Sequence, residues 1–533
     1  MKYAPVALFL LAACAGAPEG RFDGLGPHAR PVTTSSPEAR AWFDQGLAFL
    51  YAFNHDEAIR SFERAAAADP SCAMAHWGVA LANGPHINWP FVDEAHAKAA
   101  WAALGRARAG RASDVEKALI DALGRRYADP QPADRSGLDK AYADAMREVW
   151  KKHPKDADIG ALFAEALMDL RPWDLWTSDG KPQPGTDEIL RTLEAAMDVD
   201  PRHPLALHLY IHAVEASPEP GRADRAADGL RELAPGLGHL THMPSHIDVR
   251  RGRWEAAIQA NRKAIAADDG YAARAKAPNF YRVYMAHNRH MRAFAAMMTG
   301  QERQAAAALR EMVAKMPEAW LKENAGIVDG FLAAPYHVLT RFGRWEATLK
   351  EPEPAESFPI ARALRRFARA TSLAALNRPA EARAEQKAFL EARAKVPKDA
   401  AFGNNAAADL LAVAEAQLEG EIQLREGHMD GALAALREGV KREDGLRYDE
   451  PPDWIQPVRH SLGAALLKAG LAAEAEGVYL EDLRRWPENG WSLFGLAKCL
   501  KAQGKPAAEA ERRFAAAWSR ADAPLTSSCL CLP

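Results

Sequence analysis

Cysteine, β-branched residues and long apolar runs are all scarce in this chain. Five cysteines in 533 residues are too few for a disulfide framework. The longest apolar run is too short to span a bilayer. The 68 Lys+Arg and 71 Asp+Glu residues give a net charge of −3, without the basic excess of nucleic-acid-binding proteins. We therefore expect no nucleic acid partner.

Several catalytic signatures are also missing from the sequence. There is no HExxH motif, no G-x-S-x-G elbow, no dinucleotide fingerprint and no EF-hand loop. The string TSDGKP (177–182) has the wrong glycine spacing for a P-loop. No familiar reaction is therefore indicated by motif.

Helix-forming residues dominate what is present. Alanine is abundant, and no segment alternates convincingly with the period of a strand. The composition predicts an all-α protein, and the length allows several compact domains or one repeat array. Stretches rich in proline and glycine are expected to separate helices at 128–137, 171–186, 217–221 and 351–359.

One spacing of large and small residues occurs near both ends of the chain. It comprises Trp42, Gly46, Phe49, Ala58, Phe62 and Pro70, and again Leu462, Gly463, Leu466, Ala475, Tyr479 and Pro487. This pattern resembles the tetratricopeptide repeat (TPR) family. The resemblance implies a solenoid, or superhelix, of about twelve stacked helical hairpins over residues 37–521.

A second internal match lies in the middle of the chain. Pro244, His246, Gly252 and Trp254 recur 91 residues later as Pro335, His337, Gly343 and Trp345. The match indicates that the two segments make the same turn between helices. It also indicates that the histidine-rich centre, residues 204–343, is part of the repeat.

The N-terminus reads as an export signal. A charged start, a short apolar core and small residues precede Cys14, and Leu11-Ala12-Ala13-Cys14 resembles the lipobox of bacterial lipoproteins. An ordinary signal peptide with a chance cysteine is the alternative. The resemblance implies lipidation of Cys14, with Ala15 favouring the outer membrane, facing the periplasm. Residues 1–14 would be the signal, 15–36 a flexible tether, and the lipid the sole membrane contact.

Histidines are concentrated in one stretch of the sequence. Seven of the 17 fall between residues 208 and 290. In TPR proteins, positions 2, 5, 9 and 12 of each first helix face the concave groove, and our alignment of the repeats puts all seven on that face. Pro244 suits a first helical position, which places His242 in the entering loop. The residues that we expect to converge are His208, His212, Glu215, His239, His242, His246, His287 and His290.

Converging imidazoles predict a transition-metal site. Neutral imidazole is the commonest protein ligand for such metals, and three or four histidines suit Cu, Zn or Fe. Glu215 is a candidate ligand, ligand-orienting residue or general base. Two alternatives remain open, a purely structural role in packing and a metal-free groove for an anionic or peptide ligand.

Four strings resemble a large group of bacterial TPR proteins. They are HLYIHAVEAS (208–217), GHLTHMPSHI (238–247), AHNRH (286–290) and YDEPPDW (448–454). The resemblance supports the fold and points to these segments, and it implies no particular reaction.

Other candidates are assigned to the edge of the groove. They are His337, the loop residues His86 and Trp89, and Trp173 and Trp176 of the insertion RPWDLWTSDGKP. Exposed tryptophans on hairpin loops flank or cover a groove, or pack over a helix end. The C-terminal tail, residues 522–533, carries Cys529 and Cys531, which suit a soft metal, a thiol partner or a frayed end without a task.

Three functions are compatible with these features. The first is an envelope lipoprotein whose TPR groove binds a ligand at a histidine-rich metal site. The second is a metal-free scaffold that binds an extended peptide or protein during envelope assembly. The third is a metal-dependent enzyme acting on a small periplasmic molecule, with Glu215 as base.

The lipid anchor leads to a direct prediction. Replacing the lipidated thiol in Cys14→Ser should release the protein from the membrane fraction, because no other segment of the sequence is expected to hold it there. Fractionation of cells that express either form, followed by immunoblotting, measures the distribution. Undiminished membrane association of the variant would contradict the anchor.

Overall fold

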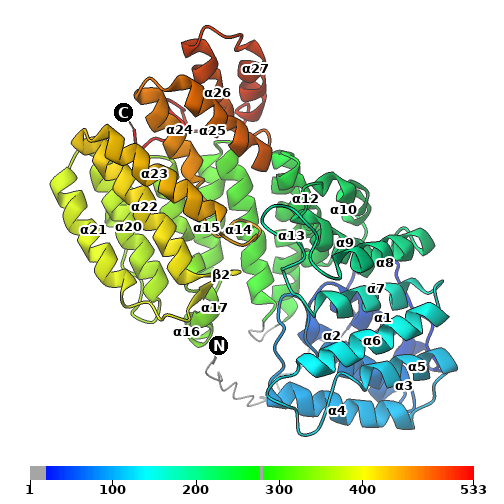
Figure 1. Ribbon diagram of the computed structural model, residues 1–533. Helices are drawn as coiled ribbons and strands as arrows, with labels where there is room; N and C mark the ends of the chain where they lie inside the picture. The colour runs from blue at the N-terminus through cyan, green and yellow to red at the C-terminus, as the bar shows by residue number, and fades with distance from the viewer. Residues whose placement is uncertain (1–19, 276–279, 533) are drawn as a thin grey trace. The chain divides into compact units, whose positions relative to one another are not determined.

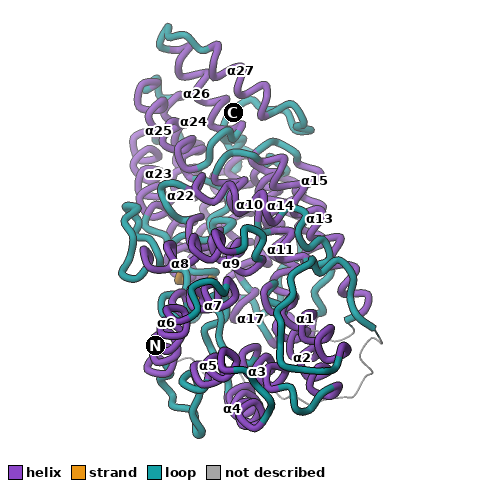
Figure 2. The backbone as a smooth tube through the Cα atoms, turned by 90° about the vertical axis from the view of Figure 1, so that its right-hand side faces the viewer, coloured by secondary structure: helices purple, strands orange, loops and turns teal. Residues whose placement is uncertain are grey.

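The computed structural model describes residues 20–275 and 280–532. This part of the chain consists mainly of α-helices joined by turns and loops (Figure 1). The predicted all-α fold of TPR-type helical hairpins is thereby confirmed. A small antiparallel hairpin is added by β1 (Ala401–Phe402) and β2 (Asn405–Ala406). Figure 2 shows how little of the backbone lies outside helices and loops.

The described chain divides into two compact units. The N-terminal unit comprises residues 20–247 and 259–288, and the C-terminal unit comprises residues 248–258 and 289–532. The sequence pattern had not indicated this division, which falls within the histidine-rich centre.

The helices of the N-terminal unit follow one another along the chain with connections of varied length. They are α1 (Pro37–Tyr51), α2 (His55–Ala68), α3 (Ala73–Ala82), α4 (Glu94–Ala109), α5 (Asp114–Leu123), α6 (Ser136–Lys152), α7 (Ala157–Met168), α8 (Thr186–Val199), α9 (Pro204–Glu215), η1 (Pro220–Ala223), α10 (Asp224–Leu230) and α11 (Gly238–His242). Three helices cross a unit boundary: α12 (Pro244–Arg250), α13 (Trp254–Arg274) and α14 (Arg282–Met298).

The C-terminal unit continues with helices of varied length. They are α15 (Glu302–Ala314), α16 (Glu318–Glu323), α17 (Ala325–Val328), η2 (Gly330–Ala333), α18 (Ala334–Arg341), α19 (Trp345–Lys350), α20 (Pro359–Ala375), α21 (Pro379–Arg393), α22 (Ala407–Glu426), α23 (Met429–Asp444), α24 (Val458–Lys468), α25 (Ala472–Arg485), α26 (Gly490–Ala502) and α27 (Ala508–Ala517).

The repeat motif works through glycines that receive a large ring. Phe62 on α2 is fully buried between α1 and α3, and a Cβ atom added at Gly46 or at Gly78 would lie 2.5 Å from that ring. Tyr479 on α25 is held in the same way, since Cβ atoms at Gly463 and Gly495 would lie 2.4 and 2.2 Å from it. The absent side chains let the helices approach closely enough to enclose the ring.

The segment predicted to be a flexible tether needs correction over residues 20–36. It has no helix, but it is fixed to the N-terminal unit by specific contacts. The Phe22 amide donates to the Gln45 side-chain oxygen over 2.9 Å, and the Arg30 guanidinium donates to both Asp156 oxygens over 2.8 and 2.9 Å. The Gly and Pro content of this segment therefore indicates irregular secondary structure rather than a flexible chain. Residues 1–19, which include Cys14, lie outside the described residues.

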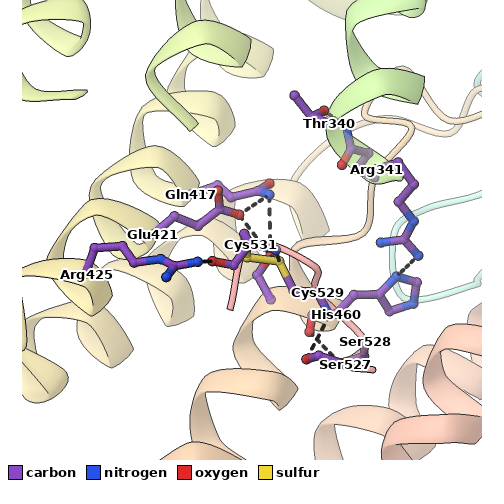
Figure 3. The surroundings of a disulfide bond; sticks show 12 residues. Thr340, Arg341, Gln417, Glu421, Arg425, His460, Ser527, Ser528, Cys529 and Cys531 are labelled. Carbon is purple, nitrogen blue, oxygen red and sulfur yellow. Dashed lines mark hydrogen bonds between the residues drawn. A yellow bond between two sulfur atoms is a disulfide. The ribbon is translucent and has the colours of Figure 1, made fainter. Parts of the chain in front are cut away.

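The C-terminal tail is also attached to the protein. Cys529 and Cys531 form a disulfide with each other (Figure 3). The Ser528 hydroxyl donates to the His460 carbonyl over 2.9 Å, and the Arg425 guanidinium donates to the Cys531 carbonyl. Of the alternatives for these cysteines, the structure has the thiol pair rather than a frayed end.

Among the helices of the described residues, none is both long and apolar enough to cross a membrane.

The glycine contacts predict a contrast between two substitutions in one helical hairpin. Gly463→Ala places a methyl group against the enclosed ring of Tyr479, so we expect the free energy of unfolding to fall by about 1–3 kcal/mol. Gly477→Ala, on α25 with nothing within 4 Å of the new methyl group, should raise it by about 0.4–1 kcal/mol. The unfolding transition of the C-terminal unit in urea gives the free energy of unfolding of each variant. Equal effects of the two substitutions would refute the packing role of the glycine.

Candidate metal centre

Helix α9 supplies three of the candidate residues. It begins after His203, whose Nδ1 atom accepts the Ala206 amide over 3.1 Å and so satisfies one free N–H of the first turn. His208, His212 and Glu215 follow at spacings of four and three residues, on one side of the helix. All three are buried, with exposed fractions of 0, 7 and 1%.

Three further helices complete the cluster. His239 and His242 lie on α11, His246 on α12 and His287 on α14. The chain breaks between α11 and α12 because Pro244 has no amide hydrogen to continue the first helix. His242, expected in an entering loop, is instead the last residue of a short helix.

His208, His212 and His239 form the first triad. Their ligand atoms all lie within 4.8 Å of one another. Nδ1 of His208 donates to the Tyr51 carbonyl over 2.8 Å, and Nδ1 of His212 donates to Oε1 of Glu215 over 2.8 Å. Both Nε2 atoms, and both ring nitrogens of His239, are buried without a hydrogen-bond partner. Four of the six ring nitrogens in the first triad are therefore buried and unsatisfied.

His242, His246 and His287 form the second triad. The Nε2 atom of His242 lies 2.7 Å from that of His246 and 3.0 Å from that of His287. Nδ1 of His242 faces Oδ1 of Asn261 at 2.7 Å, and Nδ1 of His246 faces Oε2 of Glu215 at 2.5 Å. Since oxygen acceptors occupy the Nδ1 side of two rings, the Nε2 atoms of those rings carry lone pairs.

Glu215 contacts both triads with different oxygens. Burial favours the neutral acid, but the neighbouring His246 and His212 outweigh it and lower the pKa of Glu215 to about 2. The carboxylate is therefore ionised at neutral pH. It accepts an imidazole N–H on each side, and in doing so selects the tautomer whose Nε2 is free to bind a metal.

Four of the imidazoles are held neutral. Burial lowers the pKa of His208, His239 and His242 well below the ordinary value near 6.5, and nearby imidazoles lower it further. For His212, burial also lowers the pKa, although Glu215 opposes the shift. A neutral imidazole with an available lone pair on one nitrogen is the form that binds transition metals.

Aromatic rings surround the first triad. Phe53 lies with its ring centre 4.4 Å from that of His208 and 5.6 Å from that of His239. The ring of Tyr284 also lies close to His239, with ring centres 4.5 Å apart. These rings make the immediate surroundings of the first triad largely apolar.

Trp173 covers His212. The two ring centres are 5.3 Å apart in an edge-to-face arrangement. The indole N–H of Trp173 donates to Asn88 over 3.0 Å, and the Asn88 amide donates to the Tyr284 hydroxyl over 3.2 Å. The insertion and the loop after α3 thus meet beside the first triad.

The other residues assigned to the edge of the groove in this unit lie further out. His86 stacks on His55 with ring centres 4.2 Å apart and reaches the first triad through Phe53, 5.0 Å away. Trp89 is 37% exposed. The Trp176 indole donates to the Ala213 carbonyl of α9 over 2.8 Å.

Two of the histidines predicted to belong to the site, His290 and His337, lie in the C-terminal unit, whereas both triads lie in the N-terminal unit. The ring of His290 packs 5.6 Å from Phe331, and no group of potential metal ligands among the described residues includes it. His337 packs 5.2 Å from Trp454 and accepts the Gln456 amide at Nδ1 over 3.2 Å. Both fit a packing role, although the sequence alignment had placed them on the groove face.

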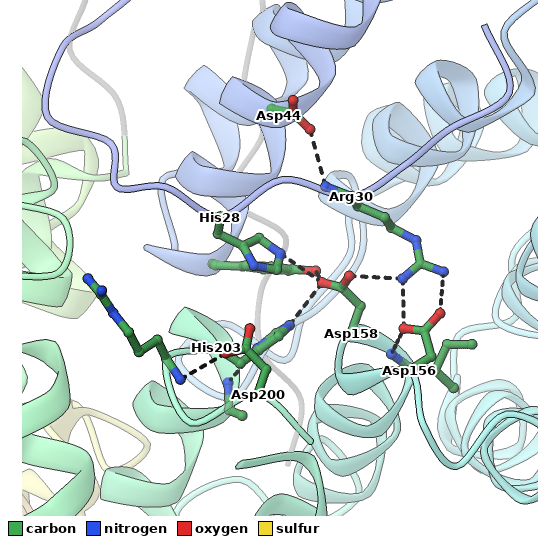
Figure 4. Close-up of polar contacts among 11 residues, drawn as sticks. His28, Arg30, Asp44, Asp156, Asp158, Asp200 and His203 are labelled. Atoms are coloured by element: carbon green, nitrogen blue, oxygen red, sulfur yellow. Dashed lines mark hydrogen bonds and ion pairs between the residues drawn. The ribbon is translucent and has the colours of Figure 1, made fainter. Parts of the chain in front are cut away.

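Sequence reasoning missed a second polar cluster in the N-terminal unit (Figure 4). His28, His203 and the Tyr51 hydroxyl bind one oxygen of Asp158 over 3.1, 3.0 and 2.5 Å. Arg30 donates to the other oxygen over 2.9 Å. Asp158 lies at the start of α7 and is surrounded by partners, so this cluster reads as an anchor for residues 20–36.

Some residues that contact the triads could not be predicted from any pattern in the sequence. Tyr51 offers a backbone carbonyl, which any residue would supply. Asn261 and Phe53 lie far from the histidine strings, and Phe53 sits in a turn with a φ of 56°. Only the packing of distant segments brings them to the site.

Comparison with known proteins identifies one repeat near the start of the described chain. Residues 39–72 match the Tetratricopeptide repeat family, over the stretch that holds most of the α1–α2 hairpin. No curated protein matches the sequence.

Solved structures show distant likeness. Human IFIT1, in a dimer with m7Gppp-AAAA, is 13% identical with a TM-score of 0.35, and 91% of each chain is covered. The APC/C hetero-tetramer Cut9–Hcn1 is 12% identical with a TM-score of 0.32, over 91% of this chain and 78% of that one. Likeness at this level says nothing about what this chain binds.

Acid should destabilise the C-terminal unit through its buried histidines. Burial lowers the pKa of His337 to about 3 and that of His290 to about 4. The unfolded chain takes up these protons near pH 6.5 and the folded chain does not. The free energy of unfolding is therefore highest above about pH 6.5. It falls toward pH 4 by about 1.4 kcal/mol per pH unit for each histidine.

His337→Asn isolates one of these protons. The variant should be less stable at pH 7, because the packed ring is lost, yet its stability should fall less steeply between pH 6 and 4.5, by about 1.4 kcal/mol per pH unit. Urea denaturation at several pH values gives the slope. His428→Asn, at an exposed position, is the matched control and should keep the parent slope. An unaltered slope in His337→Asn would contradict the assignment.

Proposed function

We propose that this chain is a transition-metal-binding protein, with its two histidine triads as the binding site on a scaffold of TPR-type hairpins. The observation that carries the proposal is the pattern of satisfied and unsatisfied nitrogens. In the first triad, Nδ1 of His208 and of His212 is bonded to oxygen, while Nε2 of each is buried without a partner. An unsatisfied buried nitrogen costs about 1–3 kcal/mol, and a bound cation would remove that cost.

The donor set favours particular metals. Six imidazoles and a single carboxylate form a nitrogen-rich site of low charge. Such a site suits Cu, Zn or Fe, whereas Mg and Ca require oxygen ligands. The chemistry of the donors therefore agrees with the metals predicted from the sequence.

The role of Glu215 favours metal positioning over base catalysis. A general base needs a free oxygen and a pKa near the working pH. Both Glu215 oxygens accept imidazole N–H groups, and its pKa lies at about 2. Glu215 is thus better suited to orienting His212 and His246 than to taking a proton from a substrate.

A metal-free peptide scaffold is the competing proposal. TPR-type hairpins offer surfaces for extended peptides. An extended peptide would not reach His208 or His242, however, since neither has any exposed surface. A scaffold function would therefore leave the two triads unexplained.

We also propose an envelope location from the sequence alone. Cys14 and the signal that precedes it lie outside the described residues, so the proposal depends on the lipobox resemblance. Lipidation there would hold the folded body at a membrane surface, facing the periplasm.

Elemental analysis of purified protein tests the metal proposal. Protein made in metal-replete medium should retain at least one equivalent of Cu, Zn or Fe per chain. The double variant His208→Ala/His212→Ala should lose it, because two nitrogens of the first triad are removed. Chelation of the parent should lower its melting temperature, since a ligand at 100 times its Kd contributes about 2.7 kcal/mol.

The exposed His428→Ala variant is the matched control and should retain the parent metal content. Circular dichroism of the double variant establishes that it is folded. A folded double variant with undiminished metal, or a parent protein that binds none of the three metals, would refute the proposal.

A further inference from the structure

The two triads lie directly beside each other. Ring centres of His212 and His246 are 5.3 Å apart, and those of His239 and His242 are 5.8 Å apart. Each of these pairs joins one ring of the first triad to one of the second. The six imidazoles therefore form one continuous cluster in the N-terminal unit.

A single ion cannot use all six imidazoles. Nitrogens bound to one ion lie at most about 4.2 Å apart, twice a typical metal–nitrogen bond of about 2.1 Å. Among the described residues, the three histidines of each triad have ligand nitrogens within 4.8 Å of one another, no such group contains all six, and a further group joins His212 and His246 to Glu215. Three nitrogens on one side of an ion are a common arrangement for catalytic and ligand-binding metals.

The arrangement of nitrogens in the second triad also favours a bound cation. The Nε2 atoms of His242 and His246 lie 2.7 Å apart, while their Nδ1 atoms face oxygen acceptors. Two lone pairs at that distance repel each other unless a proton or a cation lies between them. A metal ion bound by both nitrogens, with His287 as the third ligand, would relieve this repulsion.

Glu215 links the triads chemically. Oε1 faces His212 of the first triad and Oε2 faces His246 of the second, at 2.8 and 2.5 Å. One ionised carboxylate therefore orients a ligand in each triad and partly offsets the charge of two cations. Such carboxylate–histidine–metal contacts raise ligand basicity and fix the ring.

We propose that the N-terminal unit holds a dinuclear transition-metal centre, with one ion in each triad and Glu215 as the positioning residue shared by both. This inference rests on the proposed metal-binding function and specifies its stoichiometry and arrangement. The ions would be neighbours within one buried site.

The surroundings define the class of ligand that the centre takes. Three protein nitrogens leave each ion with an open coordination position. Phe53, Tyr284 and Trp173 close the space around the first triad with apolar ring surfaces. We take the shared ligand to be a small one such as hydroxide, which would bridge the two ions.

Copper titration of the metal-free protein tests the arrangement. The parent should bind two Cu(II) ions per chain. Because a bridging ligand couples the two unpaired electrons, its electron paramagnetic resonance signal should integrate to far fewer spins than the copper present. The metal alone is the probe, so no substrate is required.

One substitution in each triad separates the two ions. His239→Ala removes a first-triad ring that makes no hydrogen bond, and His287→Ala removes a second-triad ring. Each variant should bind one Cu(II) with full spin intensity. Glu215→Gln should weaken the binding of both ions by about 10–100-fold. His428→Ala should match the parent, and circular dichroism confirms that the variants are folded.

The outcomes distinguish this inference from the function on which it rests. A single copper ion in the parent, lost on substitution in either triad, would refute the dinuclear centre and leave metal binding intact. Two copper ions with full spin intensity would mean isolated sites and would also refute it. Absence of tight copper, zinc or iron binding would refute both.

Discussion

The buried carboxylate of Glu215 is the constraint on which the rest of the site depends. Its side chain is 1% exposed, and an ion removed from water to this extent costs several kcal/mol unless partners replace the lost hydration. His212 and His246 supply those partners from α9 and α12. The same two bonds that stabilise the carboxylate commit both Nδ1 atoms. The remaining lone pairs then point away from Glu215 and toward the other imidazoles of each triad.

The helical scaffold converts distant parts of the sequence into this arrangement. Tyr51, at the end of α1, accepts the His208 N–H with its carbonyl and donates its hydroxyl to Asp158. Asp158 in turn binds Arg30 of the N-terminal segment. Residues 20–36 are thereby coupled to the backbone that orients a first-triad histidine. The close packing of helices around rings such as Phe62 keeps these helices in register.

Much of the fold could be predicted from the sequence, because the patterns that indicate it are local. The spacing of glycine and aromatic residues identified the hairpins, and the Pro- and Gly-rich stretches at 171–186 and 351–359 do separate α7 from α8 and α19 from α20. Helical spacing likewise placed His208, His212 and Glu215 on one side of α9. The division into two units could not be predicted from the sequence, because helices α12, α13 and α14 continue across its boundaries. His290 illustrates the consequence, since it follows His287 by one turn of α14 and yet belongs to the other unit. The roles of Asn261, Phe53 and the Tyr51 carbonyl depend on long-range packing, which no local pattern records.

Anomalous X-ray diffraction from crystals of the metal-loaded protein tests the central claim most directly. Data collected on either side of the metal's absorption edge locate each ion without reference to any assumed ligand. The account predicts two peaks in the N-terminal unit, one among His208, His212 and His239 and the other among His242, His246 and His287, with Glu215 outside both coordination spheres. Metal peaks elsewhere on the chain would contradict it. The absence of any metal peak in crystals prepared with excess metal would also contradict it.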